Sequence, residues 1–116
     1  MSIDSLRSDI ASALRHQADI EAKVGSLRIE VGRLHEDVAR AQRDAARATS
    51  VSSATSHLQK AARKLKEAGD KEKRISDLEK KASAEVTRRA RAEKQLTSEL
   101  ARSHQRERDA QNRRHS

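Results

Sequence analysis

Residues 3–48 carry an apolar residue at every third or fourth position, and this periodicity constrains the fold more than any other feature of the sequence. When the chain is counted in sevens from Ile3, the first position (a) and the fourth (d) are apolar except at Gln17. Such a 3.5-residue period predicts an α-helix that packs along its length against a partner helix. The predicted oligomer seam consists of Ile3, Leu6, Ile10, Ala13, Gln17, Ile20, Val24, Leu27, Val31, Leu34, Val38 and Ala41.

The residue types in this seam indicate the partner. β-Branched residues at a, together with Leu at d, favour a parallel pair of identical helices, so we expect the chain to bind itself in at least a dimer. Gln17 either fixes the register by pairing with its own copy or is a polar residue tolerated at a partly hydrated position. The size of the oligomer and the relative direction of its chains stay open.

A second row of the same helix contains only small residues after Asp4. It occupies the second position (b) of successive heptads, and two of its members are glycines, each of which costs a helix interior about 1 kcal/mol relative to alanine. We expect the row, with Leu14 beside it, to let a second helix approach closely; the alternative is that it is the exposed side of an alanine-rich helix. The row consists of Ala11, Ala18, Gly25, Gly32, Ala39 and Ala46.

The heptad phase breaks in residues 49–56, which read TSVSSATS. Ser and Thr favour caps and turns, and Ser56 with Gln59 fits a capping box. The sequence therefore predicts a first helix over 1–48, a turn over 49–56, a basic second helix over 57–108 with a kink at 69–70, and a disordered tail over 109–116. The predicted fold class is all-α: a long coiled-coil hairpin of two antiparallel helices that assembles into an oligomeric bundle. One continuous helix with a local discontinuity is the alternative.

Composition argues against catalysis. The chain is 34% hydrophobic and has no aromatic residue and no cysteine, so it lacks the apolar bulk needed for a water-excluding pocket. None of the five histidines has the spacing of a metal site, and no phosphate-binding loop or nucleophile motif occurs. We therefore expect no enzymatic activity, no cofactor and no metal. The absence of a long apolar run and of a signal sequence predicts a cytoplasmic protein without a membrane partner.

Positive charge is concentrated in the second half of the chain. Residues 1–57 carry eight basic and eight acidic side chains, whereas residues 58–116 carry eighteen and ten, which accounts for the whole net charge of +8. The candidate polyanion contacts are Lys60, Arg63, Lys64, Arg88, Arg89 and Arg91. Interleaved acidic residues and the absence of stacking aromatic rings limit this prediction to weak, nonspecific nucleic-acid binding.

The stretch TSVSSATSHLQKAARKLKEAGDKEKRISDLEKKASAE resembles the coiled-coil region that precedes the Toll/interleukin-1 receptor (TIR) domain in many bacterial proteins. The matching features are Thr49-Ser50, Ser52-Ser53 and the segment 73–81. The resemblance implies an oligomerising or sensing module with a fused or neighbouring effector. No sequence typical of the TIR sheet is present, so no catalytic residue is carried over.

Together these features predict a non-enzymatic oligomerisation or scaffold module, which the resemblance places in a bacterial defence or signalling system. A basic coiled-coil protein that binds nucleic acid is the alternative. A scaffold for the assembly of a phage particle or a filament is a second alternative.

Overall fold

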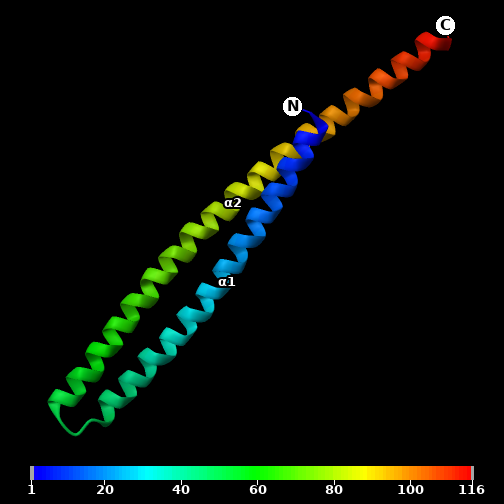
Figure 1. Ribbon diagram of the computed structural model, residues 1–116. Coiled ribbons are helices and arrows are strands. Elements are labelled where there is room, and N and C mark those ends of the chain that lie inside the picture. The colour runs from blue at the N-terminus through cyan, green and yellow to red at the C-terminus, as the bar shows by residue number, and fades with distance from the viewer. Residues whose placement is uncertain (1, 116) are drawn as a thin grey trace. The chain divides into compact units, whose positions relative to one another are not determined.

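A computed structural model describes residues 2–115, which form two α-helices joined by a short connection (Figure 1). Helix α1 spans Ile3–Arg47 and helix α2 spans Val51–His115. The described residues contain no strand. The predicted all-α fold with two long helices in a hairpin is therefore confirmed. The chain divides into two compact units, residues 20–80 and residues 1–19 with 81–116.

The start of α1 is capped by Ser2. The Ser2 hydroxyl oxygen accepts a hydrogen bond from the backbone N–H of Ser5 at 3.0 Å, and the Ser2 carbonyl accepts one from Leu6 at 3.0 Å. Asp4 lies in the first turn, where a carboxylate is favoured by the positive end of the helix dipole.

The connection between the helices is shorter than predicted, because it consists of Ala48, Thr49 and Ser50 alone. The Ser50 hydroxyl oxygen accepts a hydrogen bond from the N–H of Ser53 at 3.1 Å, and its carbonyl accepts one from Ala54 at 3.0 Å. Ser50 is thus the N-cap of α2. The predicted turn over 49–56 and the capping box at Ser56 are wrong, since one well-placed serine caps the helix and the later Ser and Thr residues are accommodated within it.

Helix α2 also differs from expectation farther along. It passes through Gly69-Asp70 without a break, and it continues through residues 109–115, for which a disordered tail was expected. Glycine ends a helix when it adopts a left-handed conformation, and none of the glycines has a positive φ. Near the end of the helix, Arg102 pairs with Glu99 at 2.8 Å and Gln105 with Asp109 at 3.0 Å, which supports a helical conformation.

In residues 20–80, the a and d positions of α1 pack on α2 in an antiparallel pair. Val24 and Leu27 form a buried cluster with Ile75. Nearer the connection, Val38 and Ala41 pack with Ala61. The chain's own second helix therefore covers the side of α1 that the sequence assigned to an oligomer seam, whereas the row of small residues had been expected to receive a second helix.

Helix α2 meets α1 with a heptad pattern of its own that is rich in alanine. Ala61 and Ala68 are 6% and 1% exposed, and their small side chains let the two backbones approach closely enough to bury Leu34 and Val38. Some of the α2 residues that face α1 are lysines. The apolar stem of a lysine can lie along the seam while its charged end reaches water. In residues 20–80 the row consists of Ala54, His57, Ala61, Lys64, Ala68, Lys71, Ile75 and Leu78.

In the other unit, the beginning of α1 packs on the later part of α2. Leu6 and Ala13 are 1% exposed, and Ala92 is 5% exposed. Helix α2 then extends beyond the start of α1 as a single helix (Figure 1). None of the helices, as far as the structure describes them, combines the length and the apolar character that crossing a bilayer requires.

Candidate functional site

The two flanks of the helix pair in residues 20–80 have different chemistry. On one flank, Arg28 pairs with Glu79 at 2.7 Å and His35 contacts Glu72 at 3.3 Å. The two α1 residues occupy the fifth position (e) of their heptads, and the two α2 residues are also seven apart. These contacts place the e row of α1 beside one row of α2. That α2 row consists of every seventh residue from Val51 and includes Glu72 and Glu79.

Toward the connection, that same row of α2 changes from charged to apolar. Counting back by sevens from Glu72 leads to Leu65, Leu58 and Val51, which are 53%, 53% and 85% exposed. Single exposed apolar residues are common on protein surfaces, but three in one helical row form a patch. Leu58 and Leu65 lie beside the packed side of α2 and not on it, because Ala61 and Ala68 occupy the seam.

The part of the predicted close-packing row of α1 that belongs to residues 20–80 lies on this flank and is open. Gly25, Gly32 and Ala46 are exposed there and Ala39 is half-buried. In the other unit, Ala11 and Ala18 are exposed as well. A Cβ atom added at Gly25, Gly32 or Gly69 would meet no described atom within 4 Å. The expectation that the second helix packs here is corrected by the structure, since α2 prefers the larger Ile, Val and Leu side chains at a and d.

The opposite flank of residues 20–80 is charged. Lys71 pairs with Glu30 at 3.2 Å. A shallow groove of about 340 Å³ lies beside this pair and is lined by Ala22, Lys23, Ser26, Leu27, Glu30 and Arg74. Charged side chains of both signs make this flank a well-hydrated surface, in contrast to the apolar row across the seam.

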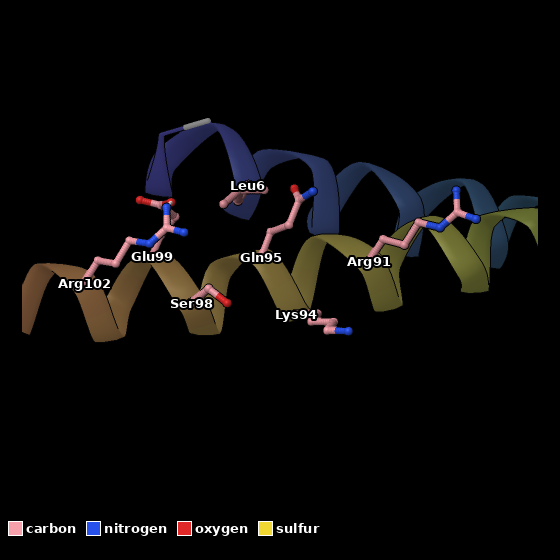
Figure 2. A pocket seen from close by; sticks show the side chains of 7 residues that line it. All are labelled: Leu6, Arg91, Lys94, Gln95, Ser98, Glu99 and Arg102. Carbon is pink, nitrogen blue, oxygen red and sulfur yellow. Dashed lines mark hydrogen bonds and ion pairs between the residues drawn. The ribbon is translucent and has the colours of Figure 1, made fainter.

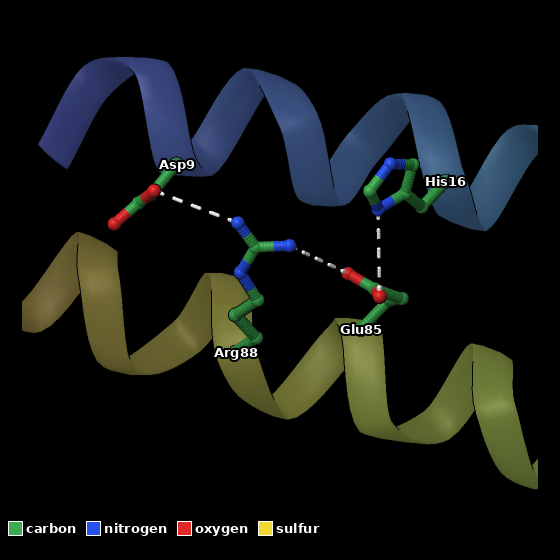
Figure 3. Close-up of polar contacts among 4 residues, drawn as sticks. All are labelled: Asp9, His16, Glu85 and Arg88. Atoms are coloured by element: carbon green, nitrogen blue, oxygen red, sulfur yellow. Dashed lines mark hydrogen bonds and ion pairs between the residues drawn. The ribbon is translucent and has the colours of Figure 1, made fainter. Parts of the chain in front are cut away.

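A polar cluster joins the two helices in the unit of residues 1–19 and 81–116. Arg88 lies 3.5 Å from Asp9 and 3.4 Å from Glu85, and Glu85 also contacts His16 at 3.6 Å (Figure 3). The side chain of Glu85 is 21% exposed, so its two partners replace much of the water that a free carboxylate would bind. The cluster links the two helices, and the Arg88 guanidinium is paired with two carboxylates of the same chain.

The neighbouring Arg89 has partners as well. It contacts Gln17 at 3.5 Å and Glu93 at 3.6 Å. Gln17 was expected either to pair with its own copy or to be tolerated at a wet position; within this chain it accepts a hydrogen bond from Arg89 of α2.

A groove of about 520 Å³ lies near the start of α1 and is lined by Leu6, Arg91, Lys94, Gln95, Ser98, Glu99 and Arg102 (Figure 2). Its three cations are spread along α2 instead of converging on one point, and Arg102 is paired with Glu99 at 2.8 Å. The groove has the composition of a weak anion-attracting surface, not of a shaped ligand site.

The candidate polyanion contacts divide into two groups in the structure. Lys60, Arg63 and Arg91 are exposed. Lys64 is half-buried at the seam, and Arg88 and Arg89 are half-buried beside the partners given above. The basic residues predicted from the sequence therefore do not form one continuous cationic surface. Within residues 2–115, no group of three or more His, Asp and Glu side chains could hold a metal ion.

Comparisons with protein-family models, with curated proteins and with solved structures find no match to this chain. The resemblance to the coiled-coil region of TIR proteins therefore stays a prediction. The function must be argued from the surfaces of the helix pair alone.

Proposed function

We propose that the chain is a non-enzymatic helical scaffold that assembles with further copies of itself in the cytoplasm. The observation that carries this proposal is the asymmetry of the helix pair in residues 20–80. One flank carries the Lys71–Glu30 ion pair. The other flank carries the Arg28–Glu79 ion pair, but toward the connection it exposes Val51, Leu58 and Leu65 beside rows of small residues. An exposed apolar row of this kind is typical of a surface that another helix covers.

The composition of the seam supports the need for further association. Several α2 positions that face α1 are Ala or Lys, including Ala61, Lys64 and Ala68, and these bury little apolar area. A small core rarely supplies more than a few kcal/mol of net stability, and small helical proteins commonly add stability by oligomerising. A partner helix that covers the apolar flank would remove the exposed side chains of Val51, Leu58 and Leu65 from water.

Such an assembly would bring together whatever is attached to it. Linking effectors through a common scaffold raises their effective concentration without any change in the effector itself. The resemblance to the region before bacterial TIR domains makes a fused or neighbouring effector of that type the partner we propose to examine first.

Light scattering during serial dilution tests the proposed assembly. We expect a mass of at least two chains at high micromolar concentration, with a fall in mass and in helicity on dilution. A monomer that is fully helical and melts cooperatively at micromolar concentration would contradict the proposal.

Nucleic-acid binding is the second candidate, and one feature favours it. Lys66, Lys73 and Lys80 are exposed and lie one heptad apart, so they form a cationic row on the outer side of α2. A row of this type would bind phosphates without reading sequence. Fluorescence anisotropy with a DNA duplex at several salt concentrations tests it. Tight binding at 150 mM salt with a steep log–log slope would favour this role over the scaffold.

A further inference from the structure

We infer that residues 51–69 of α2, with the adjoining part of α1, form a self-complementary face that binds the same face of a second copy in an antiparallel orientation. This inference rests on the proposed self-assembly and identifies the surface responsible. All of its residues lie in the unit of residues 20–80.

The face is built from two adjacent rows of α2. The large members are Val51, Leu58 and Leu65. The small members are Thr55, Ala62 and Gly69, which are also exposed. Along the helix, large and small residues alternate at spacings of four and three, which is the spacing of a packing seam. This seam is separate from the one that α2 forms with α1.

The alternation matches itself when a second copy runs antiparallel. With a two-fold axis at the level of Lys60, Leu58 lies on Ala62 of the second copy, because the two positions are equally far from 60. The same axis places Leu65 on Thr55 and Val51 on Gly69 of the second copy. Every large side chain therefore meets a small one. At Gly69 the space is open, since an added Cβ would meet nothing within 4 Å.

Helix α1 repeats the alternation on the same flank. His35 and Gln42 are the large residues of its e row, and Ala39 and Ala46 are small residues of its b row. An antiparallel pairing centred between residues 40 and 41 places Gln42 on Ala39 and His35 on Ala46 of the second copy. The two helices of one copy thus offer the same kind of surface.

One two-fold axis satisfies both helices. Ala41 packs with Ala61 in the buried cluster near the connection, so residue 41 of α1 and residue 61 of α2 lie at the same level of the hairpin. The axis required by the α2 rows and the axis required by the α1 rows therefore agree to within about 2 Å along the hairpin. The expected dimer is an antiparallel four-helix bundle in which small residues let the helices pack closely.

The charge of this face and the area that it can bury are both consistent with a second copy of the chain as its partner. The six residues of the two α2 rows are uncharged, although α2 as a whole is strongly basic. The two copies can therefore meet without burying lysine, whose desolvation would be costly. Residues 51–69 rise roughly 27 Å along the helix. Strips about 10 Å wide on four helices bury on the order of 1,000 Å², which is about the minimum area expected of a biological interface.

The first experiment enlarges a small residue of the face. Ala62→Gln adds volume where Leu58 of the second copy would lie, but Ala62 is exposed in the single chain, so its fold is expected to persist. Ala84→Gln is the matched control, since Ala84 is an exposed alanine of the same helix outside this face. Sedimentation equilibrium is expected to show a dimer dissociation constant at least tenfold higher for Ala62→Gln and less than twofold changed for Ala84→Gln. Equal dissociation constants for the two variants would overturn the inference.

The second experiment tests the register and uses the absence of native cysteine. Chains carrying Leu58→Cys are mixed with chains carrying Ala62→Cys under mild oxidation. The mixture is expected to give several-fold more disulfide-linked dimer than either variant alone, because position 58 meets position 62 and not itself. Equal yields in all three samples would refute the register.

The two proposals fail in different ways. A chain that stays monomeric in the dilution experiment rejects self-assembly and the face together. The other outcome is a chain that assembles but whose dissociation constant is unchanged by Ala62→Gln. If the mixture of cysteine variants also gives no more disulfide-linked dimer than each variant alone, the chain is a scaffold that uses another surface.

Discussion

Replacing Leu27 with alanine tests whether the a and d positions of α1 form the stabilising core of residues 20–80. Leu27 is 6% exposed and packs with Val24 and Ile75. Leu-to-Ala substitutions in protein cores cost about 2–5 kcal/mol, from lost apolar transfer plus the remaining cavity. The seam is one layer thick and its neighbours can relax toward solvent, so we expect the lower part of that range, about 2–3 kcal/mol. The midpoint of thermal unfolding should then fall by roughly 10 °C or more.

Ile29→Ala is the matched control for Leu27→Ala. Ile29 lies two residues away on the same helix and is 59% exposed, and alanine has the higher helix propensity. We expect its effect to stay within about 0.5 kcal/mol. Both variants are measured by urea titration followed by circular dichroism at 222 nm, at one fixed chain concentration, because assembly makes stability concentration-dependent. If Ile29→Ala costs as much as Leu27→Ala, the assignment of the buried side of α1 is wrong.

Three further predictions follow from the ends and the interior of the helices. Ser50→Ala removes the hydroxyl that accepts the N–H of Ser53 and should lower the free energy of unfolding by about 1 kcal/mol in a urea titration, whereas Ser50→Asp should retain most of it. Gly25→Ala should raise the free energy of unfolding by up to about 1 kcal/mol, because an added Cβ meets nothing within 4 Å; a loss of stability would show that this side of α1 is packed. Backbone amides of residues 103–115 should exchange with deuterium far faster than those around Ile75, since single helices of this length are marginal in water; equal protection would show that the end of α2 is covered.

The first helix and the hairpin could be predicted from the sequence because α1 carries its apolar residues in a regular pattern. Seven-residue spacing of Ile, Val and Leu leaves little choice of helix face. Ser2 caps α1, in keeping with the general preference for Ser, Thr, Asp or Asn just before a helix. The limits of the connection were harder to predict, since any of several serines could cap α2 and only Ser50 does so.

The buried side of α2 could not be predicted from large apolar residues, because it has few. Its seam depends on Ala54, Ala61 and Ala68, followed at the same spacing by Ile75. Alanine is common throughout the helix and so carries a weak signal, whereas the larger Leu58 and Leu65 lie on the flank. The seven-residue spacing of these alanines, continued into Ile75, is the signal that could have found the seam.

The candidate surfaces were predictable only in part. The row of small residues in α1 is visible in the sequence, but its partner is not, because the choice between α2 and a second copy depends on three-dimensional packing. Arg88 likewise has one partner 79 residues away, Asp9, and one three residues away, Glu85. The pairing with Asp9 could be identified only from the folded structure.

The three-residue connection between the helices has a consequence for alignment. A heptad pattern nearly repeats when one helix slides past the other by seven residues. Arg28 would then face Glu72 in place of Glu79, and the seam alanines of α2 would still face a and d residues of α1. Side-chain contacts alone therefore distinguish such alignments weakly. A slide of seven residues moves α2 by roughly 10 Å. Together with the lateral distance of about 8–10 Å between packed helices, this would require Ala48, Thr49 and Ser50 to be almost fully extended. The brevity of the connection thus favours the observed alignment, and lengthening it by seven flexible residues should allow the helices to populate more than one.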